Sequence, residues 1–183
     1  DLVKAALRLY PGQEPRLALG YQFRGAEVKF LKTLPPISDG SGYATIEDYS
    51  YTLVIDKGRV HAPQGGDLDV AGSVVKGPGI RVIPANAEIT LKSKSTITAA
   101  LAILDEPPFR FLTKAGQKVD IAEGQAEVVA DLKLKLVKNL KTEDISYGVT
   151  GKLTHMRSDT IVKNRTLSAE VLSVVADPAH LEI

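Results

Sequence analysis

A regular alternation of apolar and polar residues runs from Ala126 to Leu136 and constrains the fold more than any other feature of the sequence. Only Val129 departs from the pattern. Because a period of two places successive side chains on opposite faces of a sheet, the stretch predicts a strand with one dry face and one wet face. At about 3.3 Å per residue this strand would be roughly 35 Å long. The expected dry face carries Ala126, Val128, Ala130, Leu132, Leu134 and Leu136.

The same alternation returns after the polar link 138–144. Two alternating segments joined by a polar link are typical of an antiparallel pair, so we expect their dry faces to lie side by side. Segment 159–165 should then turn the chain, and a switch of apolar parity at Val171-Leu172 predicts a β-bulge. A turn at 177–179 should lead into a last strand. The dry face of the second segment is expected to carry Ile145, Tyr147, Val149 and Leu153.

The first half of the chain alternates as well but contains more glycine and proline. Gly25 separates two alternating runs, 17–23 and 26–30, and predicts a hairpin between them. The prolines and glycines of 34–42 are typical of a break, after which we expect a strand from Tyr43. Further turns are expected at Lys57-Gly58 and at 64–66, and the apolar positions of the strands around them are Leu53, Ile55, Val70, Ile89 and Leu91.

One central stretch, 95–116, changes from a period of two to a helical period. Ser95 or Thr96 can cap the helix. The prolines at 107 and 108 should end it and separate it from a second short helix. The residues expected on one stripe of the first helix are Ile97, Leu101 and Leu104.

These patterns predict a mainly β fold: one long, curved, elongated antiparallel sheet with the shape of a groove or taco, interrupted by a helical insert at 95–116. We expect residues 1–183 to form a single β-groove segment. A closed sandwich or barrel would bury the dry face completely. A sheet that stays partly open would instead present an apolar trough suited to acyl chains.

Composition and spacing argue against several classes of function. Cysteine is absent, which excludes disulfides, thiolate metal sites and cysteine nucleophiles. With 23 basic and 22 acidic residues and no long run of either sign, we expect no nucleic-acid binding. The longest charge-free run, 95–104, is far shorter than the roughly 20 apolar residues of a membrane-spanning helix. Tyr43, Tyr49, Tyr51 and Tyr147 could stack nucleic-acid bases, but strand packing explains them without a basic row.

Candidate catalytic and metal-binding residues are sparse. The three histidines lie far apart in the sequence, and no pair has zinc-site spacing. His155 shares the parity of a dry face, so it could face a ligand cavity, although a solvated residue at the end of a strand is the favoured explanation. Asp39, Asp67 and Asp69 lack the spacing of a calcium loop. We therefore expect a protein that is not an enzyme and that uses no cofactor or metal.

A series of short phrases follows one order along residues 16–183. These are Leu34-Pro35-Pro36-Ile37 with Asp39-Gly40, Val60 to Gly66, Val70-Ala71-Gly72-Ser73, Leu101 to Phe109, Gly124-Gln125-Ala126, Leu132 to Leu136, Leu140 to Tyr147, Leu167-Ser168-Ala169-Glu170 and Asp177-Pro178-Ala179. In this order they resemble the AsmA-like proteins of the Gram-negative envelope, with their YhdP-like and TamB-like branches.

The resemblance implies a long β-groove that extends through the periplasm and is anchored at the inner membrane by a helix outside this segment. It implies that phospholipid moves along the groove between the two membranes, in support of envelope integrity, with no catalytic residues. The expected partners are phospholipid acyl chains and adjacent β-groove segments of one longer chain, of which residues 1–183 would be an internal piece. The groove-lining residues would be Leu53, Ile55, Val70, Ile89, Leu91, Val128, Ala130, Leu132, Leu134, Leu136, Tyr147, Val149 and Leu153.

Two other functions remain open at this point. The chain could be a non-catalytic structural or interaction domain, closed into a sandwich or barrel, whose edges dock neighbouring domains. A hydrolase is the more distant alternative, because no acid, base and nucleophile converge in the sequence. The flanking sequence would separate these possibilities, since a groove segment should be followed by further alternating strands.

Overall fold

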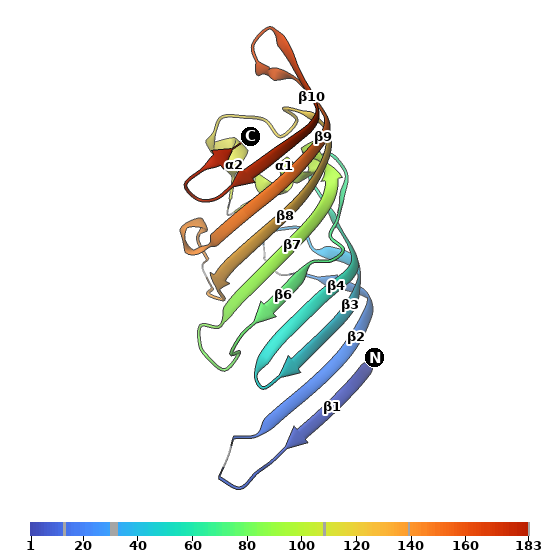
Figure 1. Cartoon of the computed structure of the whole chain (residues 1–183), viewed down its shortest axis with the longest axis vertical. Helices are drawn as coiled ribbons and strands as arrows, with labels where there is room; N and C mark the ends of the chain where they lie inside the picture. Colours follow the sequence, from blue (N-terminus) through green and yellow to red (C-terminus); the bar gives the residue numbers. More distant parts are fainter. Residues whose placement is uncertain (13, 30–32, 108, 139, 183) are drawn as a thin grey trace.

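Eleven strands form one antiparallel sheet in the computed structural model, which describes residues 1–12, 14–29, 33–107, 109–138 and 140–182. Ten of them follow the order β1-β2-β3-β4-β5-β7-β8-β9-β10-β11 (Figure 1). The mainly β fold with one antiparallel sheet is confirmed. The strands are β1 (Leu2–Arg8), β2 (Arg16–Val28), β3 (Ile37–Glu47), β4 (Ser50–His61), β5 (Asp67–Asp69), β6 (Val74–Gly77), β7 (Asn86–Thr96), β8 (Glu123–Lys135), β9 (Ser146–Val162), β10 (Arg165–Ala176) and β11 (Leu181–Glu182).

Most neighbours in the sheet are also neighbours in the sequence, and the only exception in the described chain surrounds β5 and β6. Both short strands lie between β4 and β7. β5 pairs with the end of β4 at Arg59–His61, whereas β6 pairs with its beginning at Tyr51–Val54. β5 and β6 therefore share one position in the sheet, between β4 and β7, and the link between them interrupts the sheet at that position.

The two alternating segments of the C-terminal half form the long antiparallel pair that the sequence predicts. β8 has 13 residues and β9 has 17. Leu132 pairs with Tyr147, and Ala130 pairs with Val149. The expected turn at 159–165 is tighter than predicted, because β9 continues to Val162 and Asn164 turns with a φ of 61°. The turn before β11 is confirmed, since the Asp177 carboxylate accepts hydrogen bonds from the backbone N–H groups of Ala179 and His180.

Three predicted breaks are wrong, because the glycines lie inside strands. β2 continues through Gly25 with a register shift, so no hairpin separates the two runs; Phe30 lies outside the described residues. β3 begins at Ile37 and includes the whole glycine run that was expected to precede it. β4 runs straight through Lys57-Gly58. At Gly58 a Cβ would lie 2.7 Å from the Ile37 side chain, so the neighbouring strands leave room only for glycine.

The bulge predicted at Val171-Leu172 is also wrong. The register between β9 and β10 is continuous from Leu167 to Ala176. The register shifts instead between β8 and β9, close to Gly124 and His155, which have φ values of 121° and 53°. The left-handed backbone at these two positions therefore produces the irregularity one strand earlier than expected.

The helical insert consists of two short helices, α1 (Ile97–Leu104) and α2 (Phe111–Lys114), as predicted. Thr96 caps α1 by accepting a hydrogen bond from the Ala99 N–H at 3.1 Å. Pro107 lies between the helices, and Pro108 lies outside the described residues. The predicted stripe is wrong at its end, because Leu104 is exposed. The buried residues of α1 are instead Ile97, Ala99 and Ala102.

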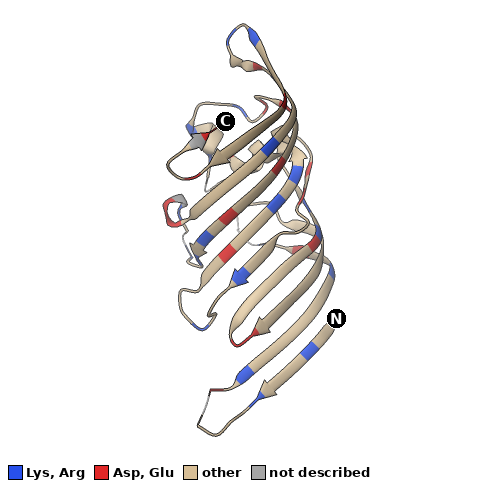
Figure 2. Ribbon diagram, viewed as in Figure 1, with Lys and Arg blue, Asp and Glu red and all other residues tan. Residues whose placement is uncertain are grey.

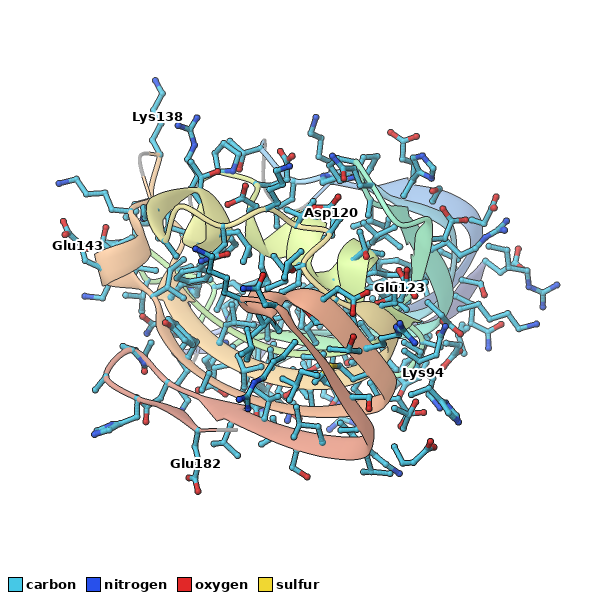
Figure 3. The ribbon with its side chains drawn as sticks, turned by 90° about the horizontal axis from the view of Figure 1, so that it is seen from above. Lys94, Asp120, Glu123, Lys138, Glu143 and Glu182 are labelled. Atoms are coloured by element: carbon cyan, nitrogen blue, oxygen red, sulfur yellow. The ribbon has the colours of Figure 1, made fainter. Side chains whose placement is uncertain are left out.

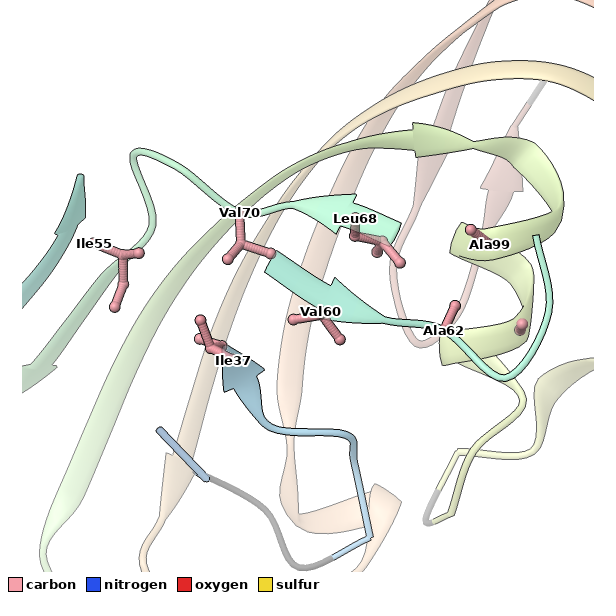
Figure 4. Packing of buried hydrophobic residues seen from close by; sticks show 8 residues of the cluster. Ile37, Ile55, Val60, Ala62, Leu68, Val70 and Ala99 are labelled. Carbon is pink, nitrogen blue, oxygen red and sulfur yellow. The ribbon is translucent and has the colours of Figure 1, made fainter. Parts of the chain in front are cut away.

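Three clusters of buried side chains form the core. The first joins the ends of β3, β4 and β5 to α1 and includes Ile55, Val70 and Ala99 (Figure 4). The second joins α1 to β8 and β9 through Ile97, Ala126 and Met156. The third contains Ala87, Leu134 and Ile145, with Phe109 packed against it. The core therefore lies between one side of the sheet and the helical insert.

Candidate functional site

The inner face of the sheet, defined as the side that carries Leu132 and its register partners, is a continuous apolar surface. Residues that are directly opposite each other on neighbouring strands point to the same face. One row of such partners crosses seven strands, a distance of roughly 29 Å at about 4.8 Å per strand. The row consists of Tyr21, Ala44, Leu53, Val75, Ile89, Leu132 and Tyr147.

Shorter parallel rows place most of the remaining candidate residues on the same face. Leu91, Ala130 and Val149 are partners on β7, β8 and β9. Two further rows cross β8, β9 and β10. One consists of Val128, Gly151 and Val174, and the other of Ala126, Leu153 and Leu172. The sequence pattern therefore identified one contiguous surface.

Three candidate residues differ from the others. Ile55 and Val70 are each only 1% exposed and belong to the solid part of the core. Leu136 was expected on the dry face of a strand, but β8 ends at Lys135 and Leu136 is 61% exposed in the connection to β9. A strand pattern that continues into a loop cannot reveal where pairing stops. Leu136 therefore does not line the inner face.

The outer face carries charges that alternate in sign from strand to strand (Figure 2). Arg59 and Asp69 are partners in the register, as are Asp69 and Lys94, Lys94 and Glu127, and Glu127 and Lys152. The Lys94 ammonium lies 3.0 Å from the Glu127 carboxylate. Each exposed pair contributes about 0–1 kcal/mol at most, so their main effect is to keep this face in water.

The segment with both helices lies against the inner face, and we refer to residues 97–107 and 109–122 as the helical strap. Viewed along the length of the molecule, the sheet curves like a trough with the strap on its open side (Figure 3). Ile97 shares a cluster with Val128 and Leu153. Ala99 and Ala102 share another with Leu53 and Leu91. The strap therefore fills part of the trough.

Burial along the inner face reflects this cover. Ala130 and Leu134 are each 8% exposed, and Leu134 belongs to the cluster against which Phe109 of the strap packs. The other candidate residues of the face remain half-buried: Leu53, Ile89, Leu91, Val128, Leu132, Tyr147, Val149 and Leu153. On β2, Leu17, Leu19 and Tyr21 are half-buried as well, and every residue of β1 is exposed. Part of the apolar surface thus stays accessible.

A cavity of about 1090 Å³ opens where α2 meets the ends of β7, β8 and β9. Its apolar wall includes Ala87, Phe111, Leu134, Ile145 and Tyr147, whereas lysines and carboxylates occupy its rim. The Phe111 and Tyr147 rings are 6.3 Å apart, and Phe111 stacks on Phe109 at 5.7 Å. The sequence pattern did not single out Phe111, although Phe109 and Phe111 follow the proline pair within three residues.

Two tyrosine hydroxyls provide a polar point on the inner face. The Tyr21 and Tyr51 oxygens are 3.5 Å apart, and both side chains are half-buried. Burial, followed by the hydrogen bond between the Tyr51 and Tyr21 hydroxyls, raises the pKa of Tyr51 above its ordinary value. This phenol therefore stays neutral over the whole physiological pH range and can offer a hydrogen bond but no charge.

The histidines and acidic residues show no catalytic arrangement in the part of the chain that the structure describes. His61 pairs with Asp67 at 2.7 Å on the surface. His155 is exposed, with its ring 3.5 Å from Glu170, so it does not face the trough. No three potential metal ligands come together among the described residues. The candidate function therefore rests on the apolar face.

Comparisons with known proteins supply no relative. No family model, no curated protein and no solved structure matches the chain. Within the described residues, no helix is long and apolar enough to cross a membrane. The resemblance to AsmA-like proteins thus rests on the sequence phrases quoted above.

Proposed function

We propose that this chain is a segment of a periplasmic, bridge-like lipid-transfer protein of the Gram-negative envelope. Its inner face would carry phospholipid acyl chains between the inner and outer membranes and so support envelope integrity. The observation that carries the proposal is the row of apolar partners across seven strands, backed by an outer face of alternating charges. The membrane anchor and further β-groove segments would lie outside this segment.

The chemistry of the inner face suits acyl chains rather than a polar ligand. Burial of apolar surface contributes about 25 cal/mol per Å², and it depends on area rather than on fixed contacts. The Tyr21 and Tyr51 hydroxyls add a local polar contact but no charge. We therefore expect acyl chains to bind with little selectivity for the lipid head group.

The edges of the sheet support a connection to adjacent segments. β1 forms one edge, and its exposed Leu2, Val3 and Leu7 offer apolar contacts beside unpaired backbone groups. An edge of this kind pairs readily with another strand. A preceding β-groove segment would continue both the hydrogen-bond ladder and the apolar inner face.

One observation favours a second function, that of a non-catalytic structural or interaction domain. The helical strap already packs on the inner face at Val128 and Leu153, as a protein core would. In that case the half-buried residues would be ordinary core positions. The sheet does not close into a barrel within the described chain, because its order begins at β1 and ends at β11.

A photo-crosslinking residue at Leu132 in the full-length protein in cells tests the proposal. Leu132 is half-buried on the inner face, and the adjacent Asp131, which is exposed on the outer face and does not line the cavity, provides the matched control. We expect mass spectrometry to find phospholipid attached at position 132 and not at 131. If neither Leu132 nor Val149 captures lipid, the structural-domain function replaces lipid transfer.

A further inference from the structure

The helical strap and an acyl chain require the same apolar surface. Ile97 on the strap shares its cluster with Val128 and Leu153, which are two of the residues that would hold lipid. Phe109 packs against the cluster of Leu134, alongside Leu132 and Tyr147. A lipid that follows the trough past β7, β8 and β9 must therefore meet the strap.

Polar contacts hold the strap at its two ends. At the first end, the Thr96 hydroxyl donates to the Gly65 carbonyl at 2.9 Å, and the Gly65 backbone packs directly against Ala99. At the second end, the Ile121 carbonyl accepts hydrogen bonds from the Ser158 hydroxyl and, at 3.0 Å, from the Thr160 hydroxyl. Both anchors belong to the body of the sheet or to its loops.

The middle of the strap has a different attachment. Between Ala99 and Asp120, the described residues form hydrogen bonds only within the strap and to its cap Thr96. Asp105 accepts bonds from the Thr113 N–H at 2.7 Å and from its hydroxyl at 2.6 Å, which join α1 to α2. The two helices thus form one unit that touches the sheet through apolar side chains alone.

The cavity lies at the end of this unit. Phe111 of α2 forms one wall, and Leu134, Ile145 and Tyr147 of the sheet form the other. An apolar chain that entered here would make contacts of the same kind that hold the strap down. Exchange of one apolar partner for another leaves no polar group of the strap unsatisfied, because its hydrogen bonds are internal.

We propose that the helical strap is a displaceable cover of the trough. An acyl chain enters at the cavity beside Phe111 and Tyr147 and takes the place of α1 and α2 on the inner face, while the anchors at Thr96 and Ile121 hold the strap's ends. The inference rests on the proposed lipid-binding function and adds its regulation: this segment conducts lipid only when the strap is lifted.

Whether the strap covers the trough can be tested by measuring lipid capture at position 132 in two variants of the strap. Ala102→Asp places a charge at a position that is buried against the sheet, whereas Ala115→Asp places the same charge at an exposed position of the strap. Because apparent affinity scales with the fraction of molecules whose site is open, we expect roughly tenfold more phospholipid at position 132 in Ala102→Asp and no change in Ala115→Asp. If Ala102→Asp captures no more phospholipid at position 132 than the wild type does, the strap does not cover the trough and the inference is overturned.

Hydrogen exchange on the purified full-length wild type supplies a measurement that requires no folded variant. Vesicles of phosphatidylethanolamine and phosphatidylglycerol should speed exchange of the amides at 99–118 and leave those of β8 unchanged. If position 132 captures lipid while exchange at 99–118 stays the same, the strap is not displaced and the inference fails alone. If position 132 captures no lipid in any variant, the proposed function fails as well.

Discussion

The inner face has the same apolar alternation on β2 as on β8, but the two regions are buried differently. On β8, Ala126 and Leu134 are buried in clusters that include Ile97 and Phe109 of the strap, although Val128 and Leu132 between them stay half-buried. On β2, the large residues Leu19 and Tyr21 are only half-buried, and β1 beside them is exposed. The comparison shows that alternation determines which side of a strand is apolar, whereas tertiary cover determines whether that side is a core or an accessible surface.

The largest expected effect comes from a charge on the covered part of the inner face. Leu134→Glu buries a carboxylate among apolar side chains and should lower the free energy of unfolding by about 3–5 kcal/mol, whereas Lys133→Glu should change it by less than about 0.5 kcal/mol. Urea denaturation followed by circular dichroism measures both values. Equal losses for the two variants would show that the two faces are wrongly assigned.

The same change on β2 should be less harmful. Leu19 is half-buried, so a glutamate there keeps part of its hydration, and Leu19→Glu should cost about 1–2 kcal/mol. The same denaturation experiment compares it directly with Leu134→Glu. A loss as large as that of Leu134→Glu would mean that β2 is covered as completely as β8.

A third prediction concerns the anchor of the strap. Gly65 has a φ of 84°, and a Cβ there would collide with the backbone of Ala99, so Gly65→Ala should cost about 2 kcal/mol. Gly66 provides the control, because its φ is 97° but its Cβ would meet no atom within 4 Å. Gly66→Ala should therefore cost only the backbone strain, about 1 kcal/mol. Similar values for both variants would show that the strap does not rest on Gly65.

The smallest effect should be a pH dependence of the strap. Hydrogen bonds from the Thr113 hydroxyl and N–H lower the pKa of the Asp105 carboxyl below its ordinary value. A carboxyl whose pKa falls on folding stabilises the folded form above its unfolded pKa of about 3.9, and this contribution disappears as the pH falls through the lower folded value. The protection of the α2 amides against hydrogen exchange, corrected for the intrinsic exchange rate at each pH, should therefore decrease in acid. Thr113→Val should weaken this dependence, and an unchanged profile would contradict the role of Thr113.

The sequence predicted the β8–β9 pair well because its signal is local. Each apolar residue from Ala126 to Leu134 except Val129 reports the face of its own strand, and the pairs Leu132–Tyr147 and Ala130–Val149 bring the two predicted dry faces together. The turns assigned to Gly25 and Gly58 were wrong because glycine marks either a turn or a close approach. At Gly58 the atoms that come close belong to Ile37, Ile55 and Val70, and nothing local in the sequence announces them.

The apolar residues of the candidate site could be predicted from the sequence, but the strap that covers part of them could not. The helical period of the insert was visible from Ile97 onward, yet its position over Leu153 and Leu172 depends on strands that follow much later in the chain. Phe111 was missed for the same reason, because its partner Tyr147 lies on β9. Hydrophobic periodicity indicates whether a segment forms a helix or a strand. Only the three-dimensional structure shows which residues that segment contacts.

The meander order of the sheet has a consequence for how the chain is assembled. Since almost every strand bonds to the strand before it and the strand after it, the sheet can grow in one direction as residues are added, much as repeat proteins gain units. The strap is an exception to this order. Its second anchor uses Ser158 and Thr160 on β9, so the strap is fixed at that end only once β9 has joined the sheet. Until then, the part of the trough beneath that second end would stay uncovered in a growing chain.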